Sequence, residues 1–444
     1  MLVMNSRGET TKKIGNKVDF VFVYEVKNRE LQGIALLGYE LLRRGYSVAY
    51  VNTWHELDRV NNHKYKAKVA VVFEAYNTAV TNFALSFIDS CDNVVNMQWE
   101  QILNDNCLRP GSIYVLNGKA NDVYHLSWGI KNKTHLTEYC GIPEDKVKLV
   151  GHVGLDFVRE EFDGFYRSRD ALLKEYDINP EKKVILFLAT FPSLDIMSAN
   201  MKRNMELYKL KRKTQEEIIL WMRKYSDQHK EVAFIYRPHP TEQVSTTLRD
   251  MCGDSIRIIK DYSVQQWIKA ADCILNWWST SLADIYAAKR GCLILRPYEM
   301  IKKHEYYCFE TANKIRTYEE FTKQIESESS FPIEKYIFEQ YYYIDEDELT
   351  YMKIVKELET IYKLKDGLPK DFIVSKKEKE SRVIRGVRIL YGYYKVKLMY
   401  MFGKDDVKDN YEEIRYHRLM DKQNYASERQ IIKLMDRIGK VLKK

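Results

Sequence analysis

The sequence of 444 residues lacks the patterns that mark membrane, secreted or disordered proteins. No apolar run approaches the roughly 18–20 residues that a membrane-spanning helix needs, and residues 1–17 lack the apolar core of a secretion signal. No long stretch of proline, glycine and serine indicates disorder, and 45% hydrophobic residues supply material for packed cores. We therefore expect a globular, cytoplasmic protein, long enough for two domains and an appendage.

Cysteine is sparse and carries no ligand pattern. The seven cysteines are scattered, odd in number and without the CxxC or Cys/His spacing of a zinc site. This spacing argues against structural zinc and against a disulfide framework, and it favours small buried side chains in a reducing compartment. The cysteines are Cys91, Cys107, Cys140, Cys252, Cys273, Cys292 and Cys308.

Common catalytic signatures are also absent. The chain has no GxxxxGK[ST], HExxH, GxSxG or GxGxxG motif, which removes the commonest competing enzyme classes. No pair of aspartates follows a predicted strand, where a metal–diphosphate site would need it, because Asp405-Asp406 lies in the tail and Asp345–Asp347 lies outside both sheets. A metal-independent reaction fits the sequence better.

Positive charge is concentrated at the C-terminal end. Residues 375–444 hold 19 Lys and Arg against 10 Asp and Glu, whereas the rest of the chain has a net charge of −1. A neutral body argues against a nucleic-acid partner. In the tail, apolar residues alternate with basic ones, which is typical of a helix lying on an anionic membrane. The alternative is that the apolar residues pack on protein. The basic residues are Arg382, Arg385, Arg388, Lys395 and Lys397.

The body alternates strands and helices in two successive arrays, which predicts parallel sheets joined by right-handed crossovers. The fold class is therefore α/β, with two doubly wound, Rossmann-like domains facing a cleft, at residues 1–175 and 176–330. A helical segment at 331–374 and a basic helical tail at 375–444 follow. The predicted strands are Asp19–Val26, Tyr46–Asn52, Lys68–Glu74, Asn93–Met97, Asp122–Trp128, Lys146–Leu149, Val184–Ala189, Val232–Tyr236, Ile256–Ile259, Cys273–Asn276 and Cys292–Leu295.

The most specific motif is the RPHP turn at residues 237–240, which ends a predicted strand. Arg237 offers a bidentate phosphate donor and His239 a donor to a phosphate or ribose oxygen. Pro240 suits the first turn of a following helix, whose free N–H groups favour anions. The alternative is a rigid turn with a packed histidine.

A second turn with similar chemistry follows the predicted strand Cys273–Asn276. Hydroxyl groups there can cap a helix and contact phosphate together with the exposed backbone amides, although plain capping is the default for such a cluster. A tryptophan at this place could stack on a base, but after a buried strand it is more often part of the core. The predicted donor-binding residues of this turn are Trp277, Ser279, Thr280 and Ser281, and Thr190 beyond the strand Val184–Ala189 joins them.

Both turns, together with three further segments, resemble surface carbohydrate biosynthesis glycosyltransferases of the GT-B type. That family is similar to capsule Kdo transferases and teichoic-acid CDP-glycerol glycerophosphotransferases, and the resemblance covers about residues 19–315. It implies that His239-Pro240 and Ser279–Ser281 hold the phosphates of a CMP- or CDP-type donor, which is a substrate, with no separate cofactor. UDP-sugar 2-epimerases share a similar donor lobe, so transfer and epimerisation both stay open. The further segments are Met97–Gln101 (MQWEQ), Ser127–Lys131 (SWGIK) and Val150–Asp156 (VGHVGLD).

Carboxylates that follow the N-terminal strands are the acid/base candidates, because the carboxyl ends of parallel strands face the ligand. Glu25 after the first strand ranks first, Glu74 after the third ranks second, and Glu100 is third. The histidine usual in the family's first-strand loop has no counterpart near Glu25.

The sequence therefore predicts a glycosyltransferase acting on a surface polysaccharide, with a glycan or lipid-linked acceptor and a possible contact with the inner membrane face. Two alternatives stay open: a nucleotide-sugar epimerase on the same fold, and a non-catalytic scaffold that binds glycan or membrane.

Overall fold

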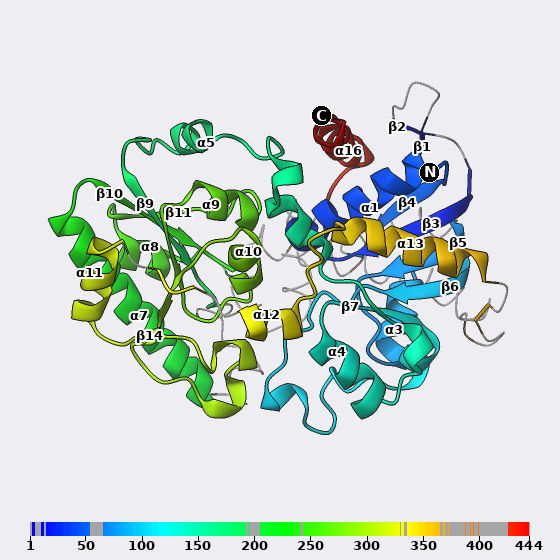
Figure 1. Cartoon of the computed structure of the whole chain (residues 1–444), viewed down its shortest axis with the longest axis horizontal. Helices are drawn as coiled ribbons and strands as arrows, with labels where there is room; N and C mark the ends of the chain where they lie inside the picture. Colours follow the sequence, from blue (N-terminus) through cyan, green and yellow to red (C-terminus); the bar gives the residue numbers. More distant parts are fainter. Residues whose placement is uncertain are drawn as a thin grey trace. The chain divides into compact units, whose positions relative to one another are not determined.

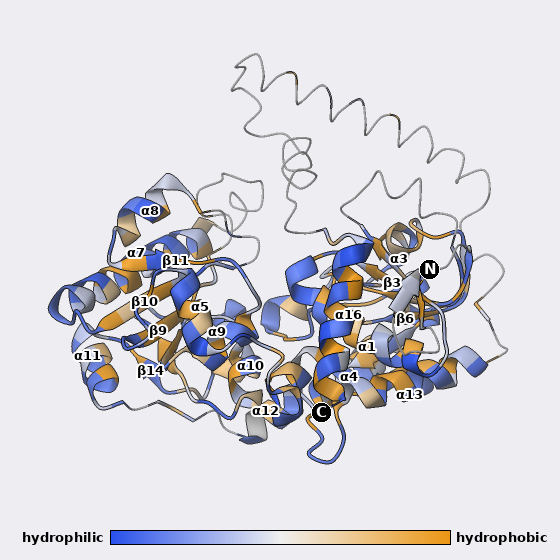
Figure 2. Cartoon of the chain, turned by 90° about the horizontal axis from the view of Figure 1, so that it is seen from above, coloured by the Kyte–Doolittle hydropathy of each residue, from blue (hydrophilic) through white to orange (hydrophobic). Residues whose placement is uncertain are grey.

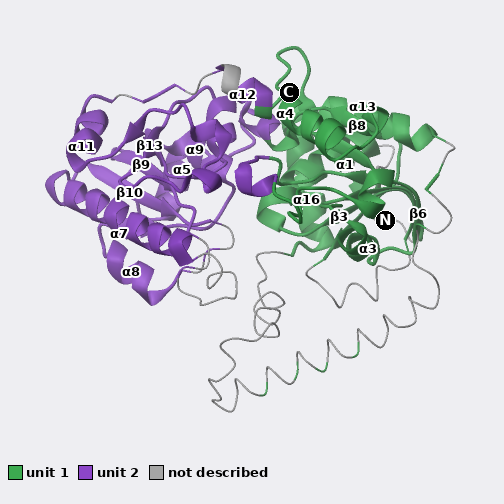
Figure 3. Ribbon diagram, turned by 90° about the horizontal axis from the view of Figure 1, so that it is seen from below, with its two compact units in different colours: residues 1–101, 109–154, 341–444 green, residues 102–108, 155–340 purple. Residues whose placement is uncertain are grey.

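The computed structural model describes residues 2–4, 10–12, 15–53, 65–191, 194, 205–239, 242, 244–328, 330–332, 335–364, 367–368, 372, 387, 391, 394, 398 and 425–443. The chain divides into two compact units (Figure 3). The first unit comprises residues 1–101, 109–154 and 341–444, and the second comprises residues 102–108 and 155–340.

A largely parallel sheet forms the centre of the first unit (Figure 1), in the order β2-β1-β4-β3-β5-β6-β7-β8. The pairs of β1 with β2 and β4 are antiparallel, whereas the pairs from β4 to β8 are parallel. The short strands β1 and β2 had no counterpart among the predicted strands, since residues 1–17 are polar. The strands are β1 (Leu2–Met4), β2 (Thr10–Lys12), β3 (Lys17–Tyr24), β4 (Val48–Asn52), β5 (Lys66–Val72), β6 (Ser90–Asn96), β7 (Tyr124–Ser127) and β8 (Val147–Leu149).

Helices cover both faces of this sheet. Helix α1 (Gln32–Arg43) follows β3 through a π-helical turn, and it ends before Gly45, whose φ of 92° suits a residue without a Cβ. Helix α3 (Thr78–Leu85) connects β5 to β6, and α4 (Ile130–Thr134) connects β7 to β8. Because β4 and β6 lie on opposite sides of the β3–β5 pair, right-handed crossovers place α1 and α3 on opposite faces.

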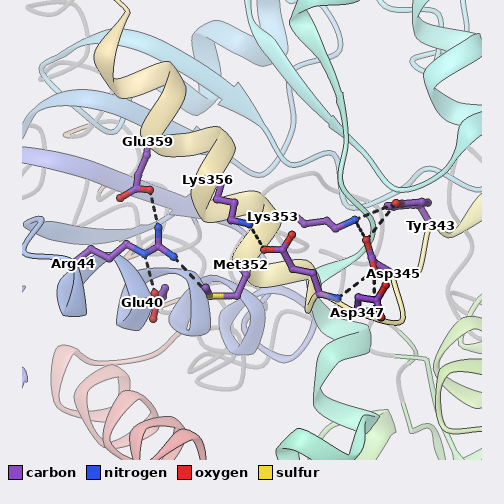
Figure 4. Close-up of polar contacts among 10 residues, drawn as sticks. Glu40, Arg44, Tyr343, Asp345, Asp347, Met352, Lys353, Lys356 and Glu359 are labelled. Atoms are coloured by element: carbon purple, nitrogen blue, oxygen red, sulfur yellow. Dashed lines mark hydrogen bonds and ion pairs between the residues drawn. The ribbon is translucent and has the colours of Figure 1, made fainter.

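Two helices from the C-terminal part of the chain pack on α1. Arg44, at the end of α1, donates to Glu359 of α13 (Thr350–Lys363) at 2.7 Å (Figure 4). Helix α16 (Glu428–Leu442) buries Met435 and Gly439 against α1, so closely that a Cβ on Gly439 would lie 2.8 Å from the Tyr39 hydroxyl. The expected separate helical segment and tail therefore belong, in these described parts, to the first unit.

The second unit contains a wholly parallel sheet with the order β11-β10-β9-β12-β13-β14. The strands are β9 (Lys183–Leu188), β10 (Val232–Arg237), β11 (Ile256–Ile258), β12 (Cys273–Asn276), β13 (Leu293–Leu295) and β14 (Lys314–Ile315). The helices are α5 (Arg169–Glu175), α7 (Met205–Gln228), α8 (Thr246–Cys252), α9 (Val264–Ala270), α10 (Leu282–Ala287), α11 (Tyr318–Glu326) and α12 (Lys335–Tyr341).

The boundary between the units differs from the expected division at residue 176. Helix α5 packs against α9, which draws residues 155–175 into the second unit. Residues 102–108 join it as well, because the Asn104 amide donates to the carbonyl of His304 at 3.4 Å. Sequence periodicity locates elements but not these long-range contacts.

The predicted fold class is otherwise confirmed. Apolar residues gather on the strands inside each unit (Figure 2). All seven cysteines are free thiols and five are buried, in keeping with their expected role as small core side chains. Among the residues that the structure describes, no helix combines the length and the apolar character needed to cross a membrane.

Candidate functional site

Each sheet reverses its strand order once, and such reversals mark the ligand sites of doubly wound folds. In the first unit the reversal lies between β3 and β5, whose carboxyl ends are followed by Glu25 and Glu74. In the second unit it lies between β9 and β12, which are followed by Thr190 and Trp277. The topology therefore brings the predicted residues of each unit to one edge of its own sheet.

An acidic cluster surrounds Arg29 at the edge of the first sheet. Its guanidinium lies 2.8 Å from Glu30, 3.0 Å from Glu100 and 3.5 Å from Glu25. Burial alone would lower the pKa of Arg29, but the carboxylates of Glu30, Glu100 and Glu25 raise it, so the side chain stays charged. Glu25 is thus tied into an ion pair, and Arg29 was not foreseen as its partner.

Glu74 differs from these carboxylates because it has no hydrogen bond or ion pair with a residue that the structure describes. Burial, followed by the charges of Glu25 and Glu100, raises the pKa of Glu74 to about 8, although Arg29 opposes the shift. A carboxyl group that titrates near neutral pH can accept or give a proton during a reaction. On these grounds we rank Glu74 above Glu25, whereas the sequence ranked Glu25 first, and the catalytic role of either residue stays a prediction.

His152 lies after β8, between two tryptophan side chains. Its ring centroid is 5.5 Å from that of Trp99 and 4.2 Å from that of Trp128, both in edge-on contacts. Burial and the charge of Arg29 lower the pKa of His152 to about 3, so the imidazole is neutral. Its Nδ1 is buried and has no hydrogen-bond partner among the described residues. In the sequence, His152 was noted only as part of the segment Val150–Asp156, and no role was predicted for it.

In the second unit, Arg237 is occupied by the backbone of its neighbours. One terminal nitrogen donates to the carbonyl of Asp261 at 2.8 Å and the other donates to the carbonyl of Tyr262. Burial lowers the pKa of Arg237 to about 10. The side chain therefore holds the loop after β11, and its contact with a phosphate stays a prediction.

The rest of the RPHP turn is organised by Glu242, which the sequence did not single out. The buried Glu242 carboxylate accepts hydrogen bonds from the Tyr236 hydroxyl at 2.6 Å and from the backbone N–H groups of His239 and Phe191 at 3.1 and 3.3 Å. It thereby joins the ends of β9 and β10 and positions His239, which is half-buried. The predicted residue Pro240 lies outside the described residues.

The second predicted turn is fixed largely by its own hydrogen bonds. The Ser279 N–H donates to Asn276 Oδ1 at 2.8 Å, and the Ser279 hydroxyl accepts from the Ser281 N–H at 3.3 Å. Ser281 is the N-cap of α10 without a side-chain capping bond, and Thr280 is exposed. Trp277 is only 1% exposed and stacks on Phe191 with a centroid distance of 4.6 Å, an arrangement that favours the core role over base stacking.

Several donors at this edge are buried without partners among the described residues, namely Thr190 Oγ1 and the indole nitrogens of Trp277 and Trp278. Each unsatisfied buried donor lowers the stability of the folded protein by roughly 1–3 kcal/mol, so a group of them is unusual in a native protein core. Lys211 of α7, which sequence reasoning missed, is 8% exposed and places its ammonium 5.0 Å from the ring centroid of Trp278. Leu207, Lys211 and Ile218 share the buried helical spacing that could have revealed it.

A cavity of about 860 Å³ in the second unit lies elsewhere. It opens at the amino-terminal ends of β9 and β12, beside Lys183 and Cys273. This is the opposite edge of the sheet from Thr190 and Trp277, and two of its charged residues, Arg169 and Asp272, pair with each other at 2.8 Å. It is therefore not the candidate site. Within the described ranges, no group of three or more His, Cys, Asp and Glu side chains is arranged to hold a metal ion.

Comparison with known proteins adds evidence on the fold. No protein-family model and no curated protein matches the chain. A variant of the wall teichoic acid polymerase TagF is 11% identical, with a TM-score of 0.50 over 79% of this chain and 90% of that chain. The same variant soaked with CDPG is 13% identical, with a TM-score of 0.50 over 78% of this chain and 88% of that chain.

A protein described as a UDP-N-acetylglucosamine 2-epimerase from Listeria monocytogenes is 11% identical, with a TM-score of 0.50 over 81% of this chain and all of the other. At such identities the likeness concerns the fold alone. The chain has the GT-B type of fold, built from two Rossmann-like units, as the sequence resemblance implied.

Proposed function

We propose that the chain is a glycosyltransferase that moves a sugar or polyol phosphate from a CMP- or CDP-type donor to a surface polysaccharide acceptor. The observation that carries this proposal is Glu74, a carboxyl group with a pKa of about 8 and no hydrogen bond or ion pair to a described residue, at the point where the first sheet reverses its strand order. The likeness in fold to a polymerase soaked with CDPG supports a nucleotide-activated donor.

In this mechanism the second unit binds the donor and the first unit binds the acceptor. Glu74 takes the proton of an acceptor hydroxyl while that oxygen bonds to the anomeric carbon or the phosphorus of the donor, and the bond to the nucleotide breaks. Glu25 and Arg29 position the acceptor and set the charge around Glu74. No aspartate pair follows a strand predicted from the sequence, so we propose that the reaction needs no metal ion.

The test is a thermal-shift screen with CMP, CDP, UDP and GDP, followed by an assay of nucleotide release with and without acceptor. Binding stabilises the fold in proportion to the excess of ligand over Kd, so a raised Tm with CMP or CDP is the expected result. Isomerisation of the donor without acceptor would instead indicate an epimerase. No response to any nucleotide would leave the scaffold alternative.

We further propose that the tail places the enzyme against an anionic membrane, where a lipid-linked acceptor would lie. Val387, Tyr391, Tyr394 and Leu398 have helical backbone, and their side chains are 51–70% exposed. Their spacings of four, three and four residues put them on one helical face, amid the basic residues of the tail. Each basic residue near such a surface contributes about 1 kcal/mol.

This membrane proposal is tested in the full chain, because a chain ending near Leu368 would also lose α16 and uncover α1. Wild type should co-sediment with anionic vesicles at low salt and be released at high salt. A variant with serine at residues 387, 391, 394 and 398 should stay in the supernatant. Equal sedimentation of both proteins would contradict the proposal.

A further inference from the structure

Lys211 is a buried lysine that forms no ion pair with a described residue; burial lowers its pKa, and the charge of Glu242 opposes that shift. Its side chain comes from α7 and is 8% exposed, yet it makes no hydrogen bond or ion pair with the residues that the structure describes. Its one polar contact is with the face of Trp278, 5.0 Å from the ammonium. Buried lysines are rare unless they are paired, so this arrangement points to a missing anion.

Other buried hydrogen-bond donors without a described partner lie near Lys211. The rings of Trp278 and Trp277 lie 5.9 Å apart, and Trp277 stacks on Phe191, the residue after Thr190. The indole N–H groups and the Thr190 hydroxyl are buried and unpartnered among the described residues. Thr190 and Trp277 follow β9 and β12, so these donors gather where the second sheet reverses its strand order.

Three other charged groups near this edge, Glu242, Arg237 and Lys260, already have partners; Lys260 donates to the carbonyl of Glu242 at 3.0 Å. Glu242 is buried, but its carboxylate already accepts four hydrogen bonds, from the side chains of Tyr236 and Gln215 and from the backbone N–H groups of His239 and Phe191. Arg237 uses its terminal nitrogens on the backbone carbonyls of Asp261 and Tyr262. Among the described cations Lys211, Arg237 and Lys260, Lys211 is the one without a hydrogen bond or ion pair, so it can bind an incoming anion.

We propose that Lys211, with Thr190 and the indole N–H of Trp278, binds the phosphate groups of the nucleotide donor. The inference rests on the proposed function for the identity of the ligand. It transfers the main phosphate contact from the RPHP turn to the buried face of α7. The indole N–H and the hydroxyl are neutral donors, so the ammonium supplies the positive charge that a diphosphate requires.

The experiment measures binding to the full chain by isothermal titration calorimetry, with CDP, cytidine and inorganic pyrophosphate as probes. Lys211→Met should weaken CDP and pyrophosphate binding at least about tenfold and leave cytidine unchanged, since the neutral side chain keeps the length but loses the charge. Lys213→Met is the matched control, because Lys213 is exposed and lies on the same helix. Lys211→Arg keeps the charge and should recover part of the affinity. If Lys211→Met fails to fold, Thr190→Val is the replacement variant, and it should also weaken CDP and pyrophosphate binding.

The outcomes separate the two proposals. If Lys211→Met binds CDP as well as wild type does, the phosphate role of Lys211 is refuted while the nucleotide donor stands. If wild type binds pyrophosphate through Lys211 but no nucleotide, the anion site stands and the proposed function fails. If wild type binds neither probe, both ideas are overturned. A purely structural Lys211 would lower the Tm of the variant without changing its affinity for either anion.

Discussion

Replacing Glu74 with glutamine should stabilise the protein and inactivate it at the same time. In the folded state, burial and the neighbouring Glu25 and Glu100 raise the pKa of Glu74 from its usual value near 4.5 to about 8. The folded protein therefore holds a proton that the unfolded chain releases. Between these two pKa values the contribution of Glu74 to stability falls as pH rises, since ionising the buried carboxyl becomes a growing penalty.

The size of the effect follows from the two pKa values. At about 1.4 kcal/mol for each pH unit, the difference between 4.5 and about 8 corresponds to at most about 5 kcal/mol. Because Glu74 is partly accessible to water, screening reduces this figure, and we expect about 2 kcal/mol. Glutamine has a similar shape and no charge, so the stability gain of Glu74→Gln should be small at pH 5 and near its full size at pH 9.

Amide hydrogen exchange, resolved to peptides from β3 and β5, measures this gain in the first unit alone. Glu138→Gln is the matched control, since Glu138 is an exposed carboxylate of the same unit. Turnover of Glu74→Gln should fall by at least ~10², while wild-type turnover should increase as pH rises toward 8. A stability difference that is the same at pH 5 and pH 9 would refute the reasoning about the buried carboxyl, and normal turnover would refute its role as base.

Three further changes test other parts of the structure. Glu25→Gln should keep nucleotide affinity, and in a steady-state assay it should lower turnover less than Glu74→Gln does. If Glu25→Gln lowers turnover more, Glu25 after β3 is the base. Arg237→Ala should lower the Tm, because each lost charge-assisted bond to the backbone costs roughly 1.5–3 kcal/mol, and it should weaken nucleotide binding in calorimetry less than Lys211→Met does, since its effect acts through the loop after β11. Met435→Ala should destabilise the first unit by about 2–5 kcal/mol in urea unfolding, whereas Lys433→Ala on the exposed face of α16 should change little; equal effects would contradict the docking of α16.

Much of the fold could be predicted because its elements repeat a local pattern. The run from Val184 to Ala189 is continuously apolar, as a parallel strand covered on both faces must be, and it matches β9 within one residue. The antiparallel pair β1 and β2 was not predicted, because strands of three residues are too short to show a recognisable pattern of apolar residues. The docking of α16 on α1 also escaped, since it depends on the fit between Gly38 and Met435, nearly 400 residues apart in the chain.

The candidate site was predictable in position but not in chemistry. Strand ends locate Glu25 and Glu74, yet only the three-dimensional arrangement shows that Arg29 pairs with Glu25 and leaves Glu74 alone. The sequence does not show whether an arginine at the end of a strand binds a ligand or the protein backbone. Arg237, the last residue of β10, donates to a backbone carbonyl. Lys211 lies in a helix rich in lysine, where only its place on the apolar face distinguishes it.

The first unit is assembled from three separate stretches of chain, and this has a consequence for its synthesis on the ribosome. A nascent chain emerges from its amino terminus, so the second unit, complete at residue 340, can fold while the first still lacks α13 and α16. Until α16 has emerged, the part of α1 around Gly38 and Tyr39 lacks its contacts with Met435 and Gly439. A chain whose synthesis stops before α16 has emerged would contain a folded second unit and a first unit with exposed apolar surface on α1, which chaperones could bind.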